Sequence, residues 1–470
     1  MKSKKTRRDF LRTVAAGSTA ASIGLRAHSA HARQIISAND RVVVAVMGAN
    51  NRGSALARGF ARLPDVDVAY ICDVDEAAVA KGVGAVVNLG LPAPRSERDF
   101  RRALEDPDVD ALVIAAPDHW HAPATILACQ AGKHVYVEKP CSHNPAEGEL
   151  MVEAARKYQR LVQIGTQRRS SPLMIEAVEQ LRGGIIGRVY HSRSGYVNRR
   201  PSIGHGRPAA IPQALDYDLW QGPAPRRSFQ DNLIHYNWHW FWHWGSGEAG
   251  NMAIHTVDLS RWGLGVDYPI QVSSSGGRYH WTDDQETPDT QVIGLDFEGG
   301  RSVMWEGLSC TGRGAKLPGV VSFHGEGGSL VFSDGSYQVY DLDGKLIFES
   351  EHPEKGPGDA YHFTNFVEAI QGRAVLNAEI EEGHKSTLLC HLANIALRLQ
   401  RTLACDPANG HIREESRPAT EGPTLCHATF MGQRLGRLFP CDPVEEPVPD
   451  NDEVMKLWGR EYEPGWEPWV

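Results

Sequence analysis

A glycine-containing turn and a carboxylate at a fixed spacing could together bind a dinucleotide. Residues 41–47 form a nearly continuous β-branched run, which is typical of a buried parallel strand. The turn that follows begins at Gly48 and ends at Gly53, where a helical segment starts. A second apolar strand is predicted over residues 66–72, and Asp73 follows it about 20 residues after Gly53, at the place of a ribose-binding acid. Helix N–H groups would receive the pyrophosphate and the carboxylate would repel a 2′-phosphate, so this spacing predicts NAD rather than NADP.

The turn departs from the usual glycine pattern at one position. Asn50 stands where the middle glycine is expected. Asparagine adopts left-handed backbone more readily than most residues, so the turn can still form. The side chains of Asn50, Asn51 and Arg52 would then point at the phosphates. The alternative interpretation is an ordinary strand-to-helix turn that binds nothing.

Further strands repeat this pattern and end in polar residues. Strands are predicted over residues 110–116, 134–137 and 161–164, with helices up to residue 131 and over 146–158. Ligands of open α/β sheets bind beyond the carboxyl ends of the strands. The predicted cofactor contacts at these ends are Pro117, Trp120, His121, Glu138 and Lys139.

Four motifs together resemble the Gfo/Idh/MocA oxidoreductases, a family named for glucose–fructose oxidoreductase, inositol dehydrogenase and a rhizopine catabolism protein. They are the turn at Gly48, Pro-Asp-His-Trp-His at residues 117–121, Glu-Lys-Pro at 138–140 and Gly-Thr-Gln-Arg-Arg at 165–169. The resemblance extends from the first strand to the helix that ends near residue 400. It implies a Rossmann domain with Gln167 among its cofactor contacts, a substrate domain, and assembly into a homo-oligomer.

The resemblance also implies a set of catalytic residues. Lys139 would lie between the nicotinamide and the substrate hydroxyl, assisted by His255 and Asp258 of the second domain. Asn251 stands where the family usually has an acid, and an amide can bind a sugar hydroxyl but cannot take a proton. The residue types agree, because a hydroxyl being oxidised needs a base, and a desolvated lysine or a histidine can serve. The alternatives are an ion pair of Lys139 with Glu138 and a buried structural role for His255.

The chain from residue 187 onwards is predicted to form a second, α+β domain. Its strands are separated by short glycine-containing turns, which indicates an open, mostly antiparallel sheet. A Pro- and Gly-rich loop over residues 201–225 is expected to wrap the site or a neighbouring subunit. Helices are predicted over residues 362–370 and 383–401. The predicted strands span residues 189–196, 290–297, 302–306, 319–325 and 329–333.

Residues 235–244 read His-Tyr-Asn-Trp-His-Trp-Phe-Trp-His-Trp. On a helix, His235, His239 and His243 would share one face and could bind a metal. The aromatic composition and the period-two alternation favour a strand instead, and no acid is adjacent to orient the histidines, so no metal site is predicted. An aromatic wall could bind the apolar face of a sugar. The predicted substrate contacts are Tyr236, Trp238, His239 and His243.

The N-terminus reads as a twin-arginine export signal. Arg7 and Arg8 lie in a basic segment, an uncharged stretch follows, and Ala30-His31-Ala32 offers a cleavage site. The stretch is shorter than the roughly 20 residues of a membrane span. We therefore predict a periplasmic or other extracytoplasmic location; the alternative is a basic, disordered tail. The predicted domains are a signal at 1–32, an NAD-binding domain at 33–168, a substrate and oligomerisation domain at 169–404 and an extended tail at 405–470.

The composition is that of a soluble globular protein, with 41% hydrophobic and 23% charged residues. A formal net charge of −9 gives no footprint for nucleic acid, and no membrane contact is expected after signal removal. Eight cysteines in a chain of 470 residues do not make a disulfide scaffold. Buried thiols are predicted at Cys72, Cys129, Cys141 and Cys390, and a disulfide among Cys405, Cys426 and Cys441 stays open. Docking onto the body or a neighbouring subunit is predicted for the tail aromatics Trp458, Tyr462, Trp466 and Trp469.

These predictions combine into one main function, hydride transfer between NAD and a sugar or polyol hydroxyl. Twin-arginine export carries folded proteins, and no free NAD pool is expected outside the cytoplasm, so the cofactor would be tightly bound and recycled in place. That leaves open an enzyme that oxidises one sugar and reduces another. It also leaves open, by resemblance to relatives, a redox-neutral glycoside hydrolase that oxidises, eliminates, hydrates and reduces. A non-catalytic sugar- or cofactor-binding protein is the third alternative, because Asn251 replaces the acid.

Overall fold

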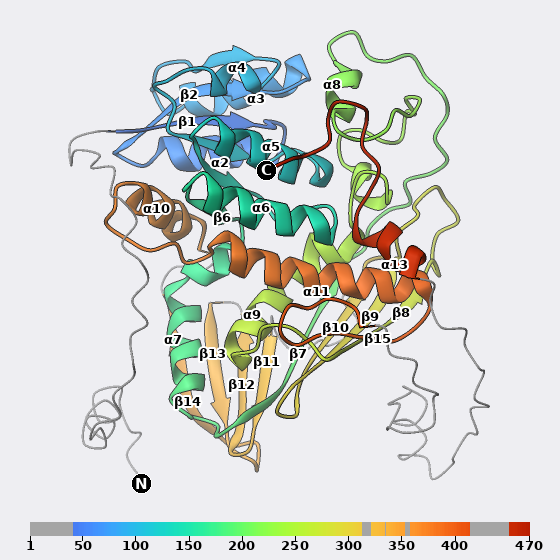
Figure 1. Cartoon of the computed structure of the whole chain (residues 1–470). Coiled ribbons are helices and arrows are strands. Elements are labelled where there is room, and N and C mark those ends of the chain that lie inside the picture. Colours follow the sequence, from blue (N-terminus) through green and yellow to red (C-terminus); the bar gives the residue numbers. More distant parts are fainter. Residues whose placement is uncertain (1–40, 313–320, 334, 353–357, 414–450) are drawn as a thin grey trace. The chain divides into compact units, whose positions relative to one another are not determined.

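The computed structural model describes residues 41–312, 321–333, 335–352, 358–413 and 451–470. The predicted export signal, Cys426 and Cys441 lie outside these residues. Two β-sheets organise the described chain, a six-stranded parallel sheet and a nine-stranded mixed sheet (Figure 1). The predicted α/β fold, with a Rossmann sheet followed by an α+β part, is confirmed.

The parallel sheet has the order β3-β2-β1-β4-β5-β6. This is the order of a dinucleotide-binding Rossmann sheet, in which ligands bind where the strand order reverses, next to β1. Strand β1 is central and almost fully buried, which explains its valine-rich sequence. The strands are β1 (Val42–Met47), β2 (Val66–Cys72), β3 (Arg95–Glu97), β4 (Ala111–Ile114), β5 (His134–Val137) and β6 (Val162–Ile164).

Helices pack against both faces of this sheet. One core cluster joins the sheet to α2, α3 and α10, and another joins it to α4, α5 and α6. Helix α10 comes from far later in the chain, and its Phe363 stacks on Phe60 of α2 with ring centroids 4.8 Å apart. The helices are α2 (Arg52–Ala61), α3 (Glu76–Val87), α4 (Arg101–Leu104), α5 (Asp118–Gln130), α6 (Pro145–Lys157) and α10 (Asp359–Ile370).

The second sheet has the order β14-β13-β12-β11-β7-β10-β9-β8-β15. Only β7 and β10 pair in parallel, so the predicted mostly antiparallel arrangement is confirmed. The strands are β7 (Val189–Val197), β8 (Gln271–Gly277), β9 (Thr290–Phe297), β10 (Arg301–Leu308), β11 (Val321–Gly325), β12 (Gly328–Ser333), β13 (Ser336–Tyr340), β14 (Leu346–Glu351) and β15 (Leu403–Ala404).

Helix α11 (Ile380–Leu399) connects the two halves. It contacts α6 of the Rossmann half, and it contacts β8 and α9 of the other half (Figure 1). Its buried leucines share one core with Trp305 and Phe323 of the mixed sheet. The remaining helices are α7 (Pro172–Arg182), α8 (Tyr217–Gln221) and α9 (Ile254–Leu264), with 3-10 turns η1 (Gln167–Ser170) and η2 (Asn237–Trp240) and a π-helical turn η3 (Ala249–Ala253).

The strand predicted over residues 235–244 is not formed, and that prediction was wrong. The segment contains the 3-10 turn η2 instead. Trp238, Phe241 and Trp244 are buried in one small core with Tyr217 and Trp220. Trp238 lies within this turn, whereas Phe241 and Trp244 follow it, so the segment lacks the continuous pleat on which a period-two alternation depends.

The tail is not wholly extended, because helix α13 (Asn451–Trp458) lies within it. Trp458 joins the core of the mixed sheet and Trp466 packs against the core of the Rossmann half, so docking onto the body is confirmed for these two. The described cysteines are all buried and free, Cys405 included. Among the described residues, no helix is long and apolar enough to cross a bilayer.

Candidate active site

A cavity of about 400 Å³ lies at the carboxyl ends of the parallel strands. The first sheet contributes the turn after β1, Asp73 after β2, and the segments after β4 and β5. Further lining comes from later parts of the chain, including His235, Tyr236, Trp238, His239, Asn251 and His255. All predicted cofactor contacts except Gly53 line this cavity, and the structure therefore brings together residues spread over more than two hundred positions of sequence.

The two turn glycines are required by close backbone packing. Gly48 has a φ of +81°, and a Cβ there would lie 2.7 Å from the backbone of Ala115 and Ala116. A Cβ on Gly53 would lie 1.6 Å from the carbonyl oxygen of Gly48. Gly53 thus acts by letting α2 begin this close to β1, which is the role of the last glycine in a dinucleotide turn.

The asparagines of the turn have partners within the protein. Their side-chain oxygens accept hydrogen bonds from Nζ of Lys81 on α3, at 3.1 Å for Asn50 and 2.9 Å for Asn51. Both residues line the cavity. Direct contact of their side chains with phosphates stays a prediction, because the described structure orients both oxygens toward Lys81.

Arg52 is likewise held by protein groups. Its Nε donates to Glu138 at 2.7 Å, and its terminal nitrogens donate to both oxygens of Asp359 on α10 at 2.9 Å. Burial alone would lower the pKa of Arg52, but Glu138 and Asp359 outweigh it and raise that pKa. The first residue of α2 therefore ties the turn to β5 and α10.

Asp73 lies at the end of β2 and lines the cavity. Its carboxylate accepts hydrogen bonds from the backbone N–H of Ala49 at 2.6 Å and of Asp75 at 3.0 Å. Burial raises the pKa of Asp73, and the two N–H groups act in the opposite direction. The carboxylate is thus fixed beside the glycine turn, as the sequence spacing predicts.

Lys139 follows β5 and reaches across to the second half of the chain. Its Nζ donates to the carbonyl oxygen of Asn251 at 2.9 Å and to Oδ1 at 3.1 Å. Burial lowers the pKa of Lys139, while Glu138 and Asp118 act against that shift. The alternative of a direct ion pair with Glu138 is not what the structure shows, since Glu138 binds Arg52.

A carboxylate lies one step behind Asn251. Nδ2 of Asn251 donates to Glu248 at 3.2 Å, and Glu248 is only 3% exposed and is paired with Arg200. Burial raises the pKa of Glu248, and Arg200 opposes the rise. Glu248 therefore places an acid next to Asn251, where the family usually has an acid at the Asn251 position itself. The atoms that accept directly from Lys139 are neutral oxygens of Asn251.

His255 lines the same cavity and is half-buried, which does not fit the alternative of a core histidine. Burial lowers its pKa well below the usual value, and the nearby positive charge of Lys139 lowers it further. An imidazole in this state is neutral near pH 7. It can accept a hydrogen bond or a proton from a hydroxyl in the cavity.

The segment after β4 is held rigidly. The ring nitrogens of His121 lie 2.6 Å and 2.8 Å from the carbonyl oxygens of Pro140 and Ala116, which links the ends of β4 and β5. Nε1 of Trp120 donates to the carbonyl oxygen of Trp220 at 2.9 Å. These contacts position Pro117, which also lines the cavity.

The predicted substrate residues separate into two places. Tyr236, Trp238 and His239 line the cavity, whereas His243 does not, and its Nε2 lies 2.8 Å from the carbonyl oxygen of Pro225. His235 is paired with Asp75 at 2.7 Å instead of facing the other histidines. The shared histidine face is therefore not formed, and no group of three candidate metal ligands occurs in the described ranges.

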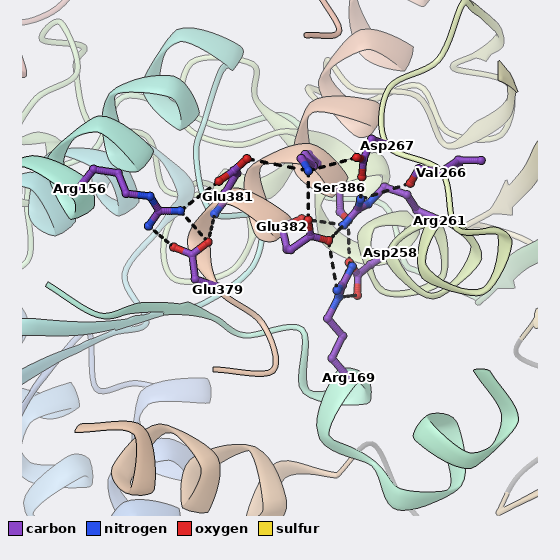
Figure 2. Close-up of polar contacts among 11 residues, drawn as sticks. Arg156, Arg169, Asp258, Arg261, Val266, Asp267, Glu379, Glu381, Glu382 and Ser386 are labelled. Atoms are coloured by element: carbon purple, nitrogen blue, oxygen red, sulfur yellow. Dashed lines mark hydrogen bonds and ion pairs between the residues drawn. The ribbon is translucent and has the colours of Figure 1, made fainter. Parts of the chain in front are cut away.

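Asp258 lies outside the cavity lining. It is 1% exposed, accepts from Nε of Arg169 at 2.9 Å and accepts from Oγ of Ser386 at 2.6 Å. Figure 2 shows this carboxylate in a network that continues to Glu382 and Arg261. In this position Asp258 connects η1, α9 and α11. Its carboxylate does not line the cavity, so the structure does not support the catalytic role predicted for Asp258.

Sequence reasoning missed several residues of the site. Glu248 could have been found, because it lies one helical turn before Asn251. Asp118 belongs to the Pro-Asp-His-Trp-His motif at residues 117–121, but no role was predicted for it. It lines the cavity and accepts a hydrogen bond from Ser246 at 2.6 Å. Trp220 and Arg98 also line the cavity, and no local pattern marks them.

These residues fit a dinucleotide. The cavity follows the glycine turn, Asp73 is fixed beside it, and the two glycines leave no room for a Cβ. Oε1 of Gln167 is buried at the same cavity and has no hydrogen-bond partner among the described residues. A cofactor amide could supply that missing donor.

Two family models match the chain. Residues 22–166 match the NAD-binding Rossmann fold of an oxidoreductase family, and residues 202–420 match the C-terminal alpha/beta domain of the same family. The first match contains all six strands of the parallel sheet, and the second contains the mixed sheet except β7.

Solved structures show the same fold at low sequence identity. Levoglucosan dehydrogenase in complex with NADH and levoglucosan is 19% identical, with a TM-score of 0.62, and covers 78% of this chain and 99% of its own. Aldose–aldose oxidoreductase from Caulobacter crescentus, complexed with glycerol, is 19% identical with a TM-score of 0.60, and covers 77% and 99%.

Sequence relatives are glycosyl hydrolase family 109 proteins. One from Shewanella pealeana is 29% identical over 165 residues, which is 34% of this chain and 36% of the relative. One from Saccharopolyspora erythraea is 31% identical over 166 residues, with the same shares. The chain thus matches about a third of the length of these relatives.

Proposed function

The chain belongs to the Gfo/Idh/MocA oxidoreductase family, and we propose that it transfers hydride between NAD and a hydroxyl group of a sugar or polyol. The observation that carries the proposal is the bond of Lys139 to Asn251 in a cavity shared with His255 and the dinucleotide turn. When bound, NAD would supply the hydride acceptor or donor. The dehydrogenase with levoglucosan and the oxidoreductase with glycerol support a polyhydroxylated substrate.

The chain's own groups divide the remaining work. A substrate hydroxyl that enters between Lys139 and His255 would replace the contact of Nζ with Asn251 and donate to the neutral amine. The lowered pKa of Lys139 makes the neutral form accessible at lower pH than for a free lysine. Asn251, oriented by Glu248, would bind a neighbouring hydroxyl. Tyr236 and Trp238 line the side where a sugar's apolar face could pack.

We also propose that the protein is exported and keeps its cofactor. The support is the order of basic run, uncharged stretch and Ala-His-Ala site in the first 32 residues. Without a free NAD pool, each turnover must restore the cofactor in place, which favours a closed redox cycle over a simple dehydrogenase.

The second candidate is redox-neutral hydrolysis of a glycosidic bond. It is favoured by the relatives described as glycosyl hydrolase family 109 proteins, which match the chain over about a third of its length. The same groups would serve, because acidifying a C–H bond next to an oxidised carbon again needs a base close to the ring. Lys139, His255 and Tyr236 are among the acids and bases that line the cavity.

One experiment separates the candidates. The mature protein, purified without added cofactor, is mixed with free sugars and with aryl glycosides while the absorbance of reduced nicotinamide and the release of aglycone are recorded. Reduction that persists with a free sugar supports the oxidoreductase. Aglycone release without lasting reduction supports the glycosidase. Binding of sugars with neither signal would contradict both and leave the non-catalytic alternative.

A further inference from the structure

A second cavity, of about 910 Å³, lies on another side of the aromatic segment. Its lining comes from the N-terminus of α6, the loop at Arg227, the end of the aromatic segment at Trp242, helix α11 and the tail around Arg460. Trp242 and His243 face this cavity, whereas Tyr236 and Trp238 face the first. Its volume falls within the range of pockets that hold drug-sized ligands.

The second cavity is strongly basic in an acidic protein. Five arginine and lysine residues line it against one lining acid, Glu461. Two of the five are paired with acids outside the lining, Arg226 with Glu463 and Arg460 with Glu147. Within the described part of the chain, Arg227, Arg398 and Lys456 form no ion pair with an acid. Clustered like charges repel one another, so a bound anion would stabilise this arrangement.

Buried donors at the same cavity also lack partners. Nδ2 of Asn144, a residue only 5% exposed, has no hydrogen-bond partner in the described ranges. The same holds for Nε and Nη1 of Arg460, whose side chain is 10% exposed. These unsatisfied groups are donors, which points to a ligand that offers acceptor oxygens.

An aromatic ring adds a second recognition element. The guanidinium of Arg398 lies over the ring of Trp242, 5.0 Å from its centroid. Burial lowers the pKa of His243 to about 4, that of His391 to about 3 and that of His143 well below its usual value, so the three histidines lining the cavity are neutral at pH 7 and do not add to its charge. The positive charge is therefore carried by arginine and lysine, which remain charged across the physiological range.

We propose that the second cavity is a binding site for a small organic anion, recognised through a carboxylate or another oxyanion group by Arg227, Lys456 and Arg398. This inference does not depend on the proposed redox chemistry, because none of these three residues lines the first cavity. The shared chemistry is the oxyanion, whether it belongs to an acidic sugar or to a free inorganic ion.

Calorimetric titration of the full chain tests the proposal with three probes: glucuronate, its uncharged counterpart glucose, and inorganic sulfate. We expect glucuronate to bind and glucose to leave this site empty. Arg227→Gln and Lys456→Gln should each weaken glucuronate binding about tenfold, the effect of losing one charge-assisted hydrogen bond. Both side chains are exposed, so neither change should prevent folding. Arg188→Gln is the matched control, because Arg188 is exposed and paired with Glu326 away from both cavities.

The outcomes are distinct. Sulfate that displaces glucuronate would support a site for the oxyanion itself, and glucuronate that resists sulfate would support an acidic sugar. Binding that stays unchanged in both Arg227→Gln and Lys456→Gln, or no binding of either anion, would overturn the proposal. Lys139→Met should leave glucuronate binding at this site intact. A failure of the anion-site proposal can therefore be told apart from a failure of the proposed redox function.

Discussion

Lys139 shows how a single residue is tuned by what surrounds it. Its Nζ binds two neutral oxygens of Asn251, and Glu248, the carboxylate that accepts from Asn251, is already paired with Arg200. A lysine in such surroundings gains less stabilisation of its charge than it would from a direct carboxylate partner. Burial therefore dominates and lowers its pKa.

Lys139→Met tests the proton-transfer role directly. We expect turnover to fall by about 10²- to 10⁴-fold, the usual contribution of a positioned acid–base group, while NADH binding persists. Turnover is followed by sugar oxidation and binding by the fluorescence of bound NADH. The control is Lys345→Met, because Lys345 is exposed in the turn between β13 and β14. Full turnover in Lys139→Met would remove this lysine from the mechanism.

The pH dependence of oxidation follows from the same lysine. Its pKa lies below the usual 10.5, and only the neutral amine accepts a proton, so kcat/KM for oxidation should rise with pH and level off below 10.5. Asn251→Asp places a carboxylate against Nζ, which favours the charged amine and should move the rise to higher pH. A rise that is unmoved by Asn251→Asp would mean that another group is being titrated.

Asp73 governs the choice of cofactor in our interpretation. Asp73→Asn keeps an oxygen for the N–H groups of Ala49 and Asp75 but removes the charge. We expect NADH to bind about tenfold more weakly and its advantage over NADPH to narrow, because one charge-assisted hydrogen bond and the repulsion of the 2′-phosphate are lost. Competitive binding of the two cofactors measures both, with the exposed Asp65→Asn as control. An unchanged preference would place cofactor selection elsewhere.

At the scale of elements, η3 and α9 act as one unit. The π-helical turn η3 carries Asn251 to Lys139, and the first turn of α9 carries His255 to the same cavity. π-helical turns occur frequently at functional sites because they shift the helical register locally. Asp258, one turn further along, instead anchors α9 to η1 and α11 through Arg169 and Ser386 (Figure 2).

Asp258→Asn should therefore act mainly on stability. It would leave the guanidinium of Arg169, 6% exposed, without its bidentate partner, and the free energy of unfolding should fall by about 3–5 kcal/mol. Asp267→Asn is the matched control in the same network, because Asp267 is 57% exposed and its loss should change stability by less than about 1 kcal/mol. Urea unfolding measures both. Unchanged stability with abolished turnover would instead restore the catalytic role that family resemblance implies.

At the scale of the whole molecule, the last described residues bind to both halves of the chain. Trp458 belongs to the core of the mixed sheet, and Trp466 packs edge-on against Trp120 in the segment after β4. Between them, Arg460 binds Glu147, which is fully buried, and donates to the carbonyl oxygen of His119. The tail thereby contacts the segment after β4 at Trp120 and His119.

Arg460→Met tests that support. It keeps most of the side-chain volume but leaves the carboxylate of Glu147 buried without its cation, so unfolding free energy should fall by about 3–5 kcal/mol. NADH binding should weaken as well, because the segment that holds Trp120 loses an anchor. Arg413→Met is the control, since Arg413 pairs with Asp406 at the surface. Stability equal to that of the control would show that the tail is not a structural part of the protein.

The local helices and strands, and the glycine turn after β1, could be predicted from the sequence. β2, β5 and β9 were predicted to the residue, and β1 and α5 to within a few residues, because buried strands and amphipathic helices leave a periodic signal. The placement of Asp73 beside the turn that begins at Gly48 was predictable because one βαβ unit fixes their spacing. The homo-oligomer stays a prediction.

The contacts between side chains far apart in sequence could be identified only from the tertiary structure. Arg52 binds Asp359, α10 packs on α2, and Asp258 faces Arg169, although no local pattern marks any of these pairs. The aromatic segment was mistaken for a strand because strand propensity reports packing surroundings. Here Trp244 packs against Trp220, and Trp238 belongs to the same small core, rather than to a sheet. Periodicity records how one element buries itself, whereas a site depends on contacts between elements far apart in sequence, and those are set by the packing of the whole fold.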